Sequence, residues 1–338
     1  MEGIRCAMKR EIKYVALVPS YEPDEKLKKV VDDLKGKNFD VVVINDGSDL
    51  KYEKFFDDCG AKVISYPTNR GKGYAIKKGI EYVKDNYHDY IIVIVDSDGQ
   101  HEANDALNLC RYVEEHPDTL AIGKRLRKDN VPLRSKIGNS ITKYVFSLAT
   151  EEDIYDTQSG LRAFEEQLTE YMLETKGDRF EYEMNILLGL KERNIKYKEI
   201  EIKTIYFDDN KGSHFNTIFD STRIYSQIIK YRMKSILLFI FEFILFIILY
   251  KIKSKIIFSN VISGLVCASI GYLMIKNDRQ KEQIFKTNLI NIGKIVLSTI
   301  IIFVLSLKLN LFLSKFISEI LMIILMHNVK SYFSNNEK

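Results

Sequence analysis

Residues 90–101 read YIIVIVDSDGQH, and this stretch decides the fold. The uninterrupted apolar run 90–95 is typical of a strand that is buried on both faces. It ends in Asp96 and Asp98, which are two residues apart, so in extended backbone their side chains point the same way. Acids after a strand either cap a turn or share a cation, and this stretch alone leaves both interpretations open.

Similar apolar runs precede and follow this stretch, and amphipathic segments separate them. The expected strands are 14–18, 40–44, 61–65, 90–95 and 120–123, and the expected helices are 24–35, 51–58, 72–85 and 103–116. This alternation predicts an α/β domain with a mostly parallel sheet that is covered on both faces. Such sheets carry their ligand sites at the carboxyl ends of the strands, where the polar stretches PSYEP (19–23) and NDGSD (45–49) also fall.

Composition narrows the class of protein. The 338 residues are enough for two domains, and the formal net charge is only +4. The four cysteines are scattered without the spacing of a zinc site or a disulfide framework, which favours a reducing compartment. The first 21 residues lack the apolar core of a signal peptide, so we expect the front domain to stay in the cytoplasm.

The chain becomes strongly apolar after residue 234. Residues 217–234 read as a basic amphipathic helix suited to a membrane surface. Four apolar segments follow, at about 236–250, 256–275, 292–307 and 311–327. Since a perpendicular span needs roughly 20 apolar residues, three of these are short, and the alternative is the buried helical core of a soluble domain. Four spans would place the basic loop 251–255 on the outer face, against the usual charge bias.

Some charged residues lie inside the apolar segments. Glu242 falls in the first, and Lys315 and Glu319 fall in the fourth with a spacing that allows them to pair on one helix face. Charges inside a membrane are costly and often mark a pathway. The alternative is an interfacial helix whose charged side chains reach the membrane surface.

Taken in order, the motifs resemble those of a known enzyme family. VPSYEPDEKL (18–27), VINDGSD (43–49), NRGKGYAIKKG (69–79) and DSDGQH (96–101) resemble family-2 glycosyltransferases with the GT-A fold. GKR (123–125), VPLRSKIGN (131–139), DTQSGLRAF (156–164), RFEYEMNILL (179–188) and NKGSHFN (210–216) resemble the polyprenyl-phosphate sugar synthase branch, which includes dolichyl-phosphate mannose synthase-like enzymes. The apolar end is similar to a GtrA-like four-helix membrane domain. The resemblance implies a GT-A domain over 1–216, an interface helix over 217–234 and an all-α transmembrane domain over 235–338.

The resemblance also implies roles for single residues on the donor side. Pro19, Tyr21, Glu22, Asp46 and Lys72 match nucleotide-binding positions, with Gly71 and Gly73 allowing close approach of the backbone. Asn45 stands where the family has a first acid, which leaves donor specificity open. Asp96, Asp98 and Gln100 match the family's metal triplet, whose oxygen ligands suit Mg²⁺ or Mn²⁺. Lys72 could instead be an ordinary helix start.

Basic residues are the candidates for phosphate binding. Arg125, Arg134 and Arg162 are candidate phosphate clamps, because guanidinium groups bind phosphate bidentately. Lys211, Ser213 and His214 match an acceptor-phosphate loop, although the family more often has lysine where His214 stands. Glu183 is a candidate catalytic residue, and the alternative is a charge at a helix N-terminus. A lipid phosphate acceptor is already an anion and needs no base.

The resemblance implies a multi-pass membrane enzyme with its catalytic domain in the cytoplasm. It would move a hexose from a UDP- or GDP-sugar to a polyprenyl phosphate. Two alternatives remain: transfer to a glycan hydroxyl, and translocation of the lipid-linked sugar by the GtrA-like half. No nucleic acid partner is expected, and the oligomeric state, a homo-oligomer included, stays open.

Overall fold

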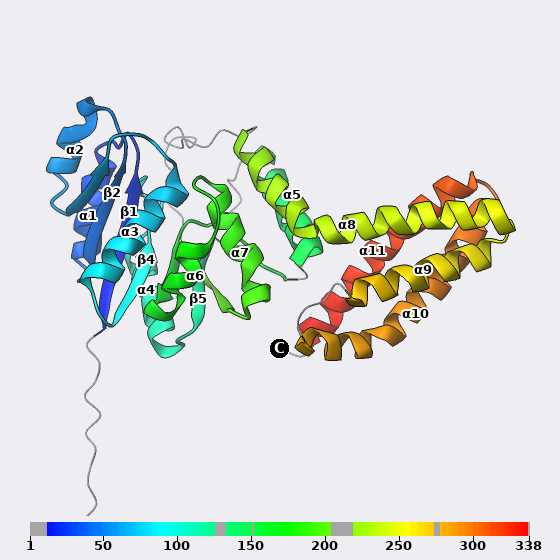
Figure 1. The fold of residues 1–338 in the computed structure, drawn as a ribbon. Coiled ribbons are helices and arrows are strands. Elements are labelled where there is room, and N and C mark those ends of the chain that lie inside the picture. The colour runs from blue at the N-terminus through cyan, green and yellow to red at the C-terminus, as the bar shows by residue number, and fades with distance from the viewer. Residues whose placement is uncertain (1–11, 126–132, 151, 204–218, 274–277, 337–338) are drawn as a thin grey trace, which may run out of the picture. The chain divides into compact units, whose positions relative to one another are not determined.

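The computed structural model describes residues 12–125, 133–150, 152–203, 219–273 and 278–336. For 133–141, 278–291 and most of 326–336 it describes the backbone alone. The chain divides into two compact units, Met1–Ile228 and Ile229–Lys338. The first is an α/β unit, and the second consists of helices (Figure 1).

A seven-stranded sheet forms the centre of the α/β unit, with strand order β3-β2-β1-β4-β6-β5-β7. The strands are β1 (Lys13–Ser20), β2 (Asp40–Asp46), β3 (Lys62–Tyr66), β4 (Tyr90–Ile94), β5 (Thr119–Arg125), β6 (Arg162–Glu165) and β7 (Lys196–Ile202). Only β6 runs antiparallel to its neighbours β4 and β5. The prediction of a mostly parallel sheet is therefore confirmed.

Helices cover both faces of this sheet. The described helices of this unit are α1 (Lys26–Lys35), α2 (Glu53–Asp57), α3 (Lys72–Asn86), α4 (Ala103–Glu115), α5 (Leu133–Thr150), α6 (Thr169–Glu174) and α7 (Glu181–Arg193). α1 and α4 pack on one face, and their buried side chains share one core cluster with β1, β2 and β4. α3 packs on β1 and β2 and contacts α6 and α7 (Figure 1). β1 and β4 are apolar along their length because they lie between these two layers.

The order of the strands reverses between β1 and β4. The chain proceeds from β1 to β2 and β3 on one side, and then β4 pairs with the other side of β1. Helices that follow adjacent strands diverge at such a point, which leaves a crevice outside the carboxyl ends of the two strands. The segments that follow β1 and β4, at Tyr21 and at Asp96, therefore meet at this crevice.

The described residues of the second unit form four helices, the first of which begins in the α/β unit. They are α8 (Phe219–Lys253), α9 (Ile256–Leu273), α10 (Asp278–Ser306) and α11 (Leu311–Asn336), and the boundary between the units falls within α8. Residues 219–234 are thus continuous with the first apolar segment, because 219–253 contains no glycine or proline to end the helix. Among the described residues, Ser221–Lys253 is long and apolar enough to cross a membrane.

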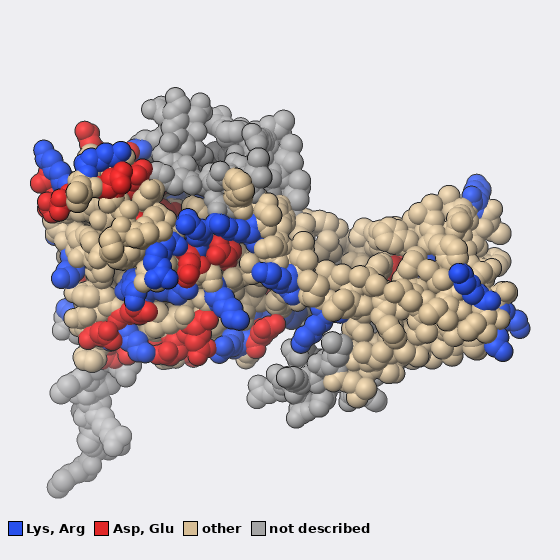
Figure 2. All heavy atoms as spheres, turned by 45° about the horizontal axis from the view of Figure 1, so that its top comes forward, with Lys and Arg blue, Asp and Glu red and all other residues tan. Residues whose placement is uncertain are grey.

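The surface of the helical unit is apolar. Large hydrophobic side chains are exposed along all four helices, for example Ile244, Leu265, Val304 and Ile323. Figure 2 shows charged side chains spread over the α/β unit, whereas the visible face of the helical unit carries few of them outside its ends. A soluble domain rarely exposes apolar area on this scale. The α/β unit has the polar surface of a water-soluble domain, and the helical unit does not.

The interior of the helical unit, in contrast, contains charge. The Nζ atom of Lys315, which is fully buried, donates to Glu242 at 2.9 Å, Asn260 at 2.7 Å and Glu319 at 2.6 Å. Asn260 donates in turn to the hydroxyl groups of Ser298 and Thr299, each at 2.8 Å. We call Glu242, Asn260, Lys315 and Glu319 the polar hub. It joins α8, α9 and α11, and its partners add α10, so the predicted pairing of Lys315 with Glu319 is confirmed.

Candidate active site

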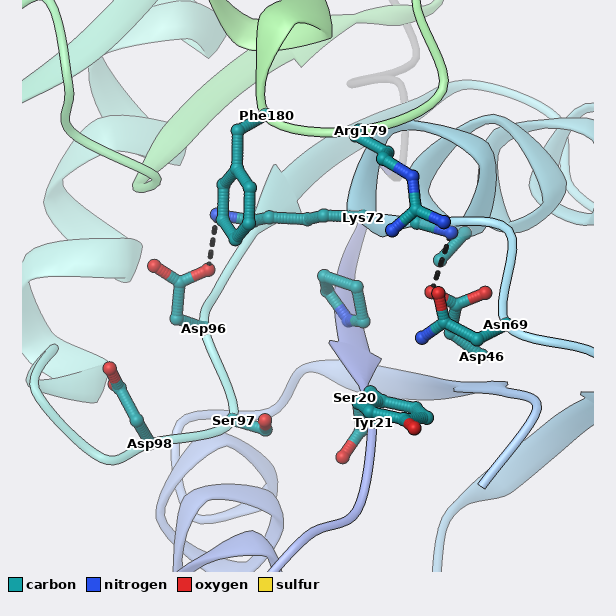
Figure 3. A pocket seen from close by; sticks show the side chains of 13 residues that line it. Ser20, Tyr21, Asp46, Asn69, Lys72, Asp96, Ser97, Asp98, Arg179 and Phe180 are labelled. Carbon is teal, nitrogen blue, oxygen red and sulfur yellow. Dashed lines mark hydrogen bonds and ion pairs between the residues drawn. The ribbon is translucent and has the colours of Figure 1, made fainter. Parts of the chain in front are cut away.

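A cavity of about 520 Å³ opens at the crevice between β1 and β4 (Figure 3). Predicted site residues supply much of its wall, namely Pro19, Tyr21, Asp46, Lys72, Asp96 and Asp98. The remaining lining residues are Ser20, Asn69, Gly71, Ala75, Ser97, Arg179 and Phe180. The sequence motifs thus converge on one cavity, because parallel strands bring the segments that follow them to the same edge of the sheet.

Asp46 ends β2 and holds the loop before α3. Its carboxylate accepts hydrogen bonds from the Tyr66 hydroxyl and from the backbone N–H groups of Arg70 and Gly71, each at 2.8 Å. Burial raises the pKa of Tyr66, and both the hydrogen bond from Tyr66 to Asp46 and the negative charge of Asp46 raise it further. Three of roughly four carboxylate lone pairs are therefore engaged inside the protein. Asp46 shapes the cavity wall chiefly by ordering residues 69–71.

The turn after β1 is held against the turn after β2. Glu22 has a left-handed backbone with φ of 48°, and its N–H donates to the Ser48 hydroxyl at 2.8 Å. Asn45, which stands in place of a first acid, accepts the backbone N–H of Ser48 at 2.9 Å. An amide side chain therefore performs the turn-forming work of an aspartate at this position. Glu22 helps to form this turn but does not line the cavity.

Two glycines at the start of α3 allow another segment to approach. Gly71 has a φ of 106°, and a methyl group there would lie 2.4 Å from Cγ of Arg179. A methyl group on Gly73 would lie 2.5 Å from Cβ of Tyr182. The backbone N–H of Tyr74 donates to the Asp178 carbonyl at 2.9 Å. The glycines expected to lie against a nucleotide thus also permit the chain around 178–182 to pack on α3.

Lys72 bridges two acids at the inner wall of the cavity. Its Nζ atom lies 2.7 Å from Oδ1 of Asp96 and 2.9 Å from Oε1 of Glu183. Burial alone would lower the pKa of Lys72, but the charges of Asp96 and Glu183 outweigh it and the pKa is raised. Burial likewise opposes ionisation of Asp96, yet Lys72 and His101 hold the pKa of that carboxyl well below its usual range. Lys72 and Asp96 are therefore both charged at neutral pH.

Asp98 has fewer partners than Asp96. One of its oxygens accepts the backbone N–H of Gln100 at 3.0 Å, and no described group donates to the other. Burial and the charge of Asp96 raise the pKa of Asp98, which is the behaviour of a carboxylate short of positive charge. In the described part of the chain no three His, Cys, Asp or Glu side chains cluster as a metal site. The oxygen donors of Asp98 and Gln100 nevertheless suit a hard cation that takes its other ligands from a bound phosphate.

His101 and Gly160 stand behind Asp96. Nε2 of His101 lies 3.6 Å from Oδ2 of Asp96, and the imidazole is buried. A methyl group on Gly160 would lie 2.4 Å from Oδ2 of Asp96 and 2.9 Å from Nζ of Lys72. The loop before β6 therefore presses directly on the charged pair. The sequence motifs predicted no role for Gly160 or His101, because their close packing on Asp96 depends on the fold.

Arg125 and Arg162, both predicted as phosphate clamps, do not line the cavity. Arg125 forms a bidentate pair with Asp156, at 2.7 Å from Nε and 2.8 Å from Nη2. Burial alone would raise the pKa of Asp156, but hydrogen bonds and the charge of Arg125 lower it. Arg162 is 1% exposed and donates to the carbonyl groups of Ser159 and Glu183. Both arginines support the loop and helix that carry Gly160 and Glu183.

The predicted acceptor-phosphate residues cannot be placed against this cavity. Lys211, Ser213 and His214 lie outside the described residues, and so does the side chain of Arg134 in α5. Sequence reasoning also missed several residues that line the cavity. Among them, Asn69, Arg179 and Phe180 have large side chains. Arg179 and Phe180 are the first two residues of the RFEYEM stretch, in which only the glutamates were considered as site residues. They reach the cavity because this stretch packs on Gly71.

Comparison with known proteins agrees with this geometry. Residues 15–170 match the model of the family described as Glycosyl transferase family 2. An uncharacterised protein of Methanocaldococcus jannaschii is 30% identical over 208 residues, which cover 60% of this chain and 85% of that protein. The UDP-N-acetylglucosamine–dolichyl-phosphate N-acetylglucosaminyltransferase of Methanococcus voltae is 25% identical over 244 residues, 65% of this chain and 96% of that enzyme. A solved mycobacterial protein shares the fold, with a TM-score of 0.52 at 15% identity over 65% of this chain and 75% of that one.

Proposed function

Because the chain belongs to glycosyl transferase family 2 and is a glycosyltransferase, we propose that it transfers a hexose from a nucleotide-sugar to the phosphate of a polyprenyl phosphate. The observation that carries the proposal is the pair Asp96 and Asp98 at the crevice between β1 and β4, beside the buried ammonium of Lys72. A cavity with an under-neutralised carboxylate and a fixed cation suits a sugar diphosphate that arrives with a metal ion.

A named relative and the character of the helical unit support a lipid acceptor. The relative from Methanococcus voltae is named for transfer to dolichyl phosphate, and its match covers 65% of this chain. The exposed apolar side chains of α8 to α11 provide a surface that belongs in lipid. Arg134, Lys211, Ser213 and His214 remain the proposed ligands of the lipid phosphate, as the sequence motifs predict.

The reaction needs alignment and charge stabilisation rather than proton removal. A phosphate oxygen of the lipid forms a bond to the anomeric carbon, while the bond from that carbon to the β-phosphate oxygen breaks with inversion. The nucleoside diphosphate departs with the bonding electrons. Lys72 holds Asp96 in place at the inner wall of the cavity, which keeps this edge of the site aligned for the transfer.

Mg²⁺ or Mn²⁺ is the proposed cofactor. Asp98 would hold it through the carboxylate oxygen that no described group contacts, with Gln100 beside it. When bound, the ion would neutralise charge on the departing diphosphate. Asp96, which already pairs with Lys72, would orient this edge of the site more than it would ligate the metal.

The helical unit is the proposed GtrA-like multi-pass membrane domain, and it keeps the α/β unit at the cytoplasmic face. α8 is long enough to span by itself, and Ile256–Gly271 and Ile292–Ser306 are shorter apolar helices. A buried polar hub inside an apolar exterior is the arrangement expected of helices that pack together in lipid. Labelling of Ser254→Cys by a membrane-impermeant thiol reagent tests this topology, which requires the α8–α9 turn to be accessible from the outside only.

The function is tested with the full chain in detergent. Nucleotide-sugars are offered with Mg²⁺ and a short polyprenyl phosphate, and products are identified by mass. We expect one lipid-phosphate hexose, no product in the presence of a chelator, and at least 100-fold less product from Asp98→Ala, the scale of a lost transition-state charge contact. Absence of transfer from every common nucleotide-sugar, with nucleotide binding intact, would refute the proposal.

A glycan hydroxyl is the alternative acceptor, and Glu183 distinguishes the two. A hydroxyl acceptor needs a base, whereas Glu183 is bound to Lys72 at 2.9 Å in a supporting position. Glu183→Gln retains an oxygen for Lys72 but cannot accept a proton. With a lipid phosphate acceptor we expect transfer to fall by less than about tenfold. A loss of about a hundredfold or more in a stable protein would favour the hydroxyl acceptor.

A further inference from the structure

The cavity has two chemically different ends. Asp96 and Asp98 occupy one end, and Tyr21, Asn69 and Arg179 occupy the other (Figure 3). In the figure Arg179 and Tyr21 lie on opposite sides of the cavity, with Asn69 at the edge between them. If the diphosphate meets the metal at the acidic end, the nucleobase extends toward this second end.

Arg179 brings an uncommitted positive charge to the second end. Lys72 is the other cation that lines the cavity, and two acids neutralise it. Within the described ranges no group is bonded to the guanidinium of Arg179, and its side chain is exposed. A guanidinium in this state is available to a ligand, and its planar face can stack on an aromatic ring.

The backbone beneath Arg179 is fixed even though its side chain is exposed. The carboxylate of Glu181 accepts the N–H groups of Asp178 and Arg179 at 3.2 and 3.3 Å. Asp178 is tied to α3 by an ion pair with Lys77 at 2.9 Å, as well as by its carbonyl. The aliphatic part of the Arg179 side chain also packs on Gly71, so closely that a side chain on residue 71 would collide with it. The guanidinium therefore projects over the cavity from a rigid anchor.

We propose that Arg179 covers one face of the donor nucleobase and Tyr21 the other, so that residue 179 sets much of the affinity for the donor nucleotide. This inference rests on the proposed nucleotide-sugar donor. Asp46 is a weaker candidate for contact with the base, because its carboxylate is engaged by Tyr66, Arg70 and Gly71. Loss of one stacked guanidinium should weaken nucleotide binding about 5- to 20-fold.

The experiment measures binding to the full chain in detergent by calorimetry, with weak ligands measured by displacement. UDP, UMP and uridine are titrated in parallel with GDP, GMP and guanosine, and the series that the wild-type protein prefers is used for the variants. The variants are Arg179→Ala and, as a matched control, Arg193→Ala. Arg193 lies at the other end of α7 and pairs with Glu174 at 2.8 Å on the surface. Melting temperatures confirm that both variants are folded.

A base contact predicts the same fold-loss for diphosphate, monophosphate and nucleoside in Arg179→Ala, and no loss in Arg193→Ala. A loss that shrinks as phosphates are removed would show that Arg179 binds phosphate, and would overturn the base contact. Unchanged binding of all three ligands would overturn it as well. A wild-type protein that binds neither series would refute the donor proposal itself, so the two failures are distinguishable.

Discussion

At the scale of the residue, the site separates side chains that face the ligand from side chains that hold the wall. Asp46 lines the cavity, yet its carboxylate already accepts hydrogen bonds from Tyr66 and from the backbone N–H groups of residues 70 and 71. Arg125 looked equally available in the sequence, but it is matched by Asp156. Asp98 and Arg179 are the charged lining residues that keep free bonding capacity among the described groups.

Asp46→Ala should therefore destabilise the fold as well as weaken nucleotide binding. The substitution removes three hydrogen bonds and leaves two backbone N–H groups near the cavity without their acceptor. We expect a loss of about 2–4 kcal/mol in the free energy of unfolding, measured with denaturant. Asp49→Ala is the control, because Asp49 is exposed and only weakly paired with Lys51 at 4.0 Å. A variant that unfolds like wild type would contradict the structural role.

Lys72→Met should change how acid acts on stability. In the wild-type protein the pKa of Asp96 lies below its usual value despite burial, so Asp96 stabilises the fold above about pH 4 and loses this contribution in acid. Without the ammonium group, burial would raise that pKa, and the ionised carboxylate would cost stability above about pH 4. The stability gap between variant and wild type should therefore narrow from pH 7 to pH 4. Lys51→Met, on the surface, should show a constant small gap.

Gly160→Ala should impair transfer more than folding. The added methyl group would meet the carboxylate of Asp96 at 2.4 Å and the ammonium of Lys72 at 2.9 Å, so the charged pair must move. Displacement of catalytic groups by about 1 Å commonly costs around a hundredfold in rate. We expect at least a tenfold lower turnover, measured with saturating donor. Gly36→Ala, where a methyl group makes contacts of 3.4 Å, should transfer sugar at the wild-type rate.

Sequence reasoning predicted which motifs come together at this edge of the sheet, because parallel strands bring the segments that follow them to one place. Pro19, Asp46, Lys72, Asp96 and Asp98 were all expected and all line one cavity. It could not tell which charges are satisfied internally, because the partners are distant in sequence. Asp156 lies 31 residues from Arg125, and the Glu183 carbonyl lies 21 residues from Arg162. Such pairings depend on tertiary packing rather than on local pattern.

At the scale of the element, the apolar runs predicted β1 to β5 but gave no sign of β6. This strand has only four residues, Arg162–Glu165, and exists because β4 and β5 bond to it on both sides. A segment so short has no alternation to recognise. Its position buries Arg162, which explains why a residue expected to bind phosphate lies inside the sheet.

The contact between α3 and α7 gives a prediction at this scale. Alanine usually stabilises a helix interior by about 0.5–1 kcal/mol relative to glycine. Gly73→Ala should instead destabilise by about 1–3 kcal/mol, because the methyl group would overlap Tyr182 at 2.5 Å. Gly293→Ala in α10 is the matched control, since a methyl group there meets nothing within 4 Å. Thermal unfolding should separate the two variants, and equal melting temperatures would rule out tight packing.

At the scale of the whole molecule, the rise in apolar content after residue 234 predicted a second unit. The structure divides the chain after Ile228. The predicted and observed boundaries differ by a few residues because α8 runs without a break from the first unit into the second. Each of the four predicted apolar segments coincides over most of its length with a described helix, from α8 to α11. The sequence could not show that Lys315 would reach Asn260 and Glu242, on two other helices.

The polar hub should stabilise the helical unit as a whole. Lys315→Met would leave the partly buried Glu242 and the buried Glu319 without their shared ammonium group. Loss of one partner of a buried pair costs about 3–5 kcal/mol. We expect a lower melting temperature in detergent and easier proteolysis of the helical unit. Lys308→Met, in the exposed turn between α10 and α11, should melt like wild type.

The hub also sets a condition on how the protein is made. Glu242 lies in α8, the first helix of this unit to leave the ribosome, and Lys315 lies in α11, 73 residues later. Until translation reaches α11, the carboxylate waits without the ammonium group that will neutralise it. A chain truncated before Lys315 would present an unpaired acid among apolar helices, a feature by which a quality-control protease can distinguish it from the finished protein.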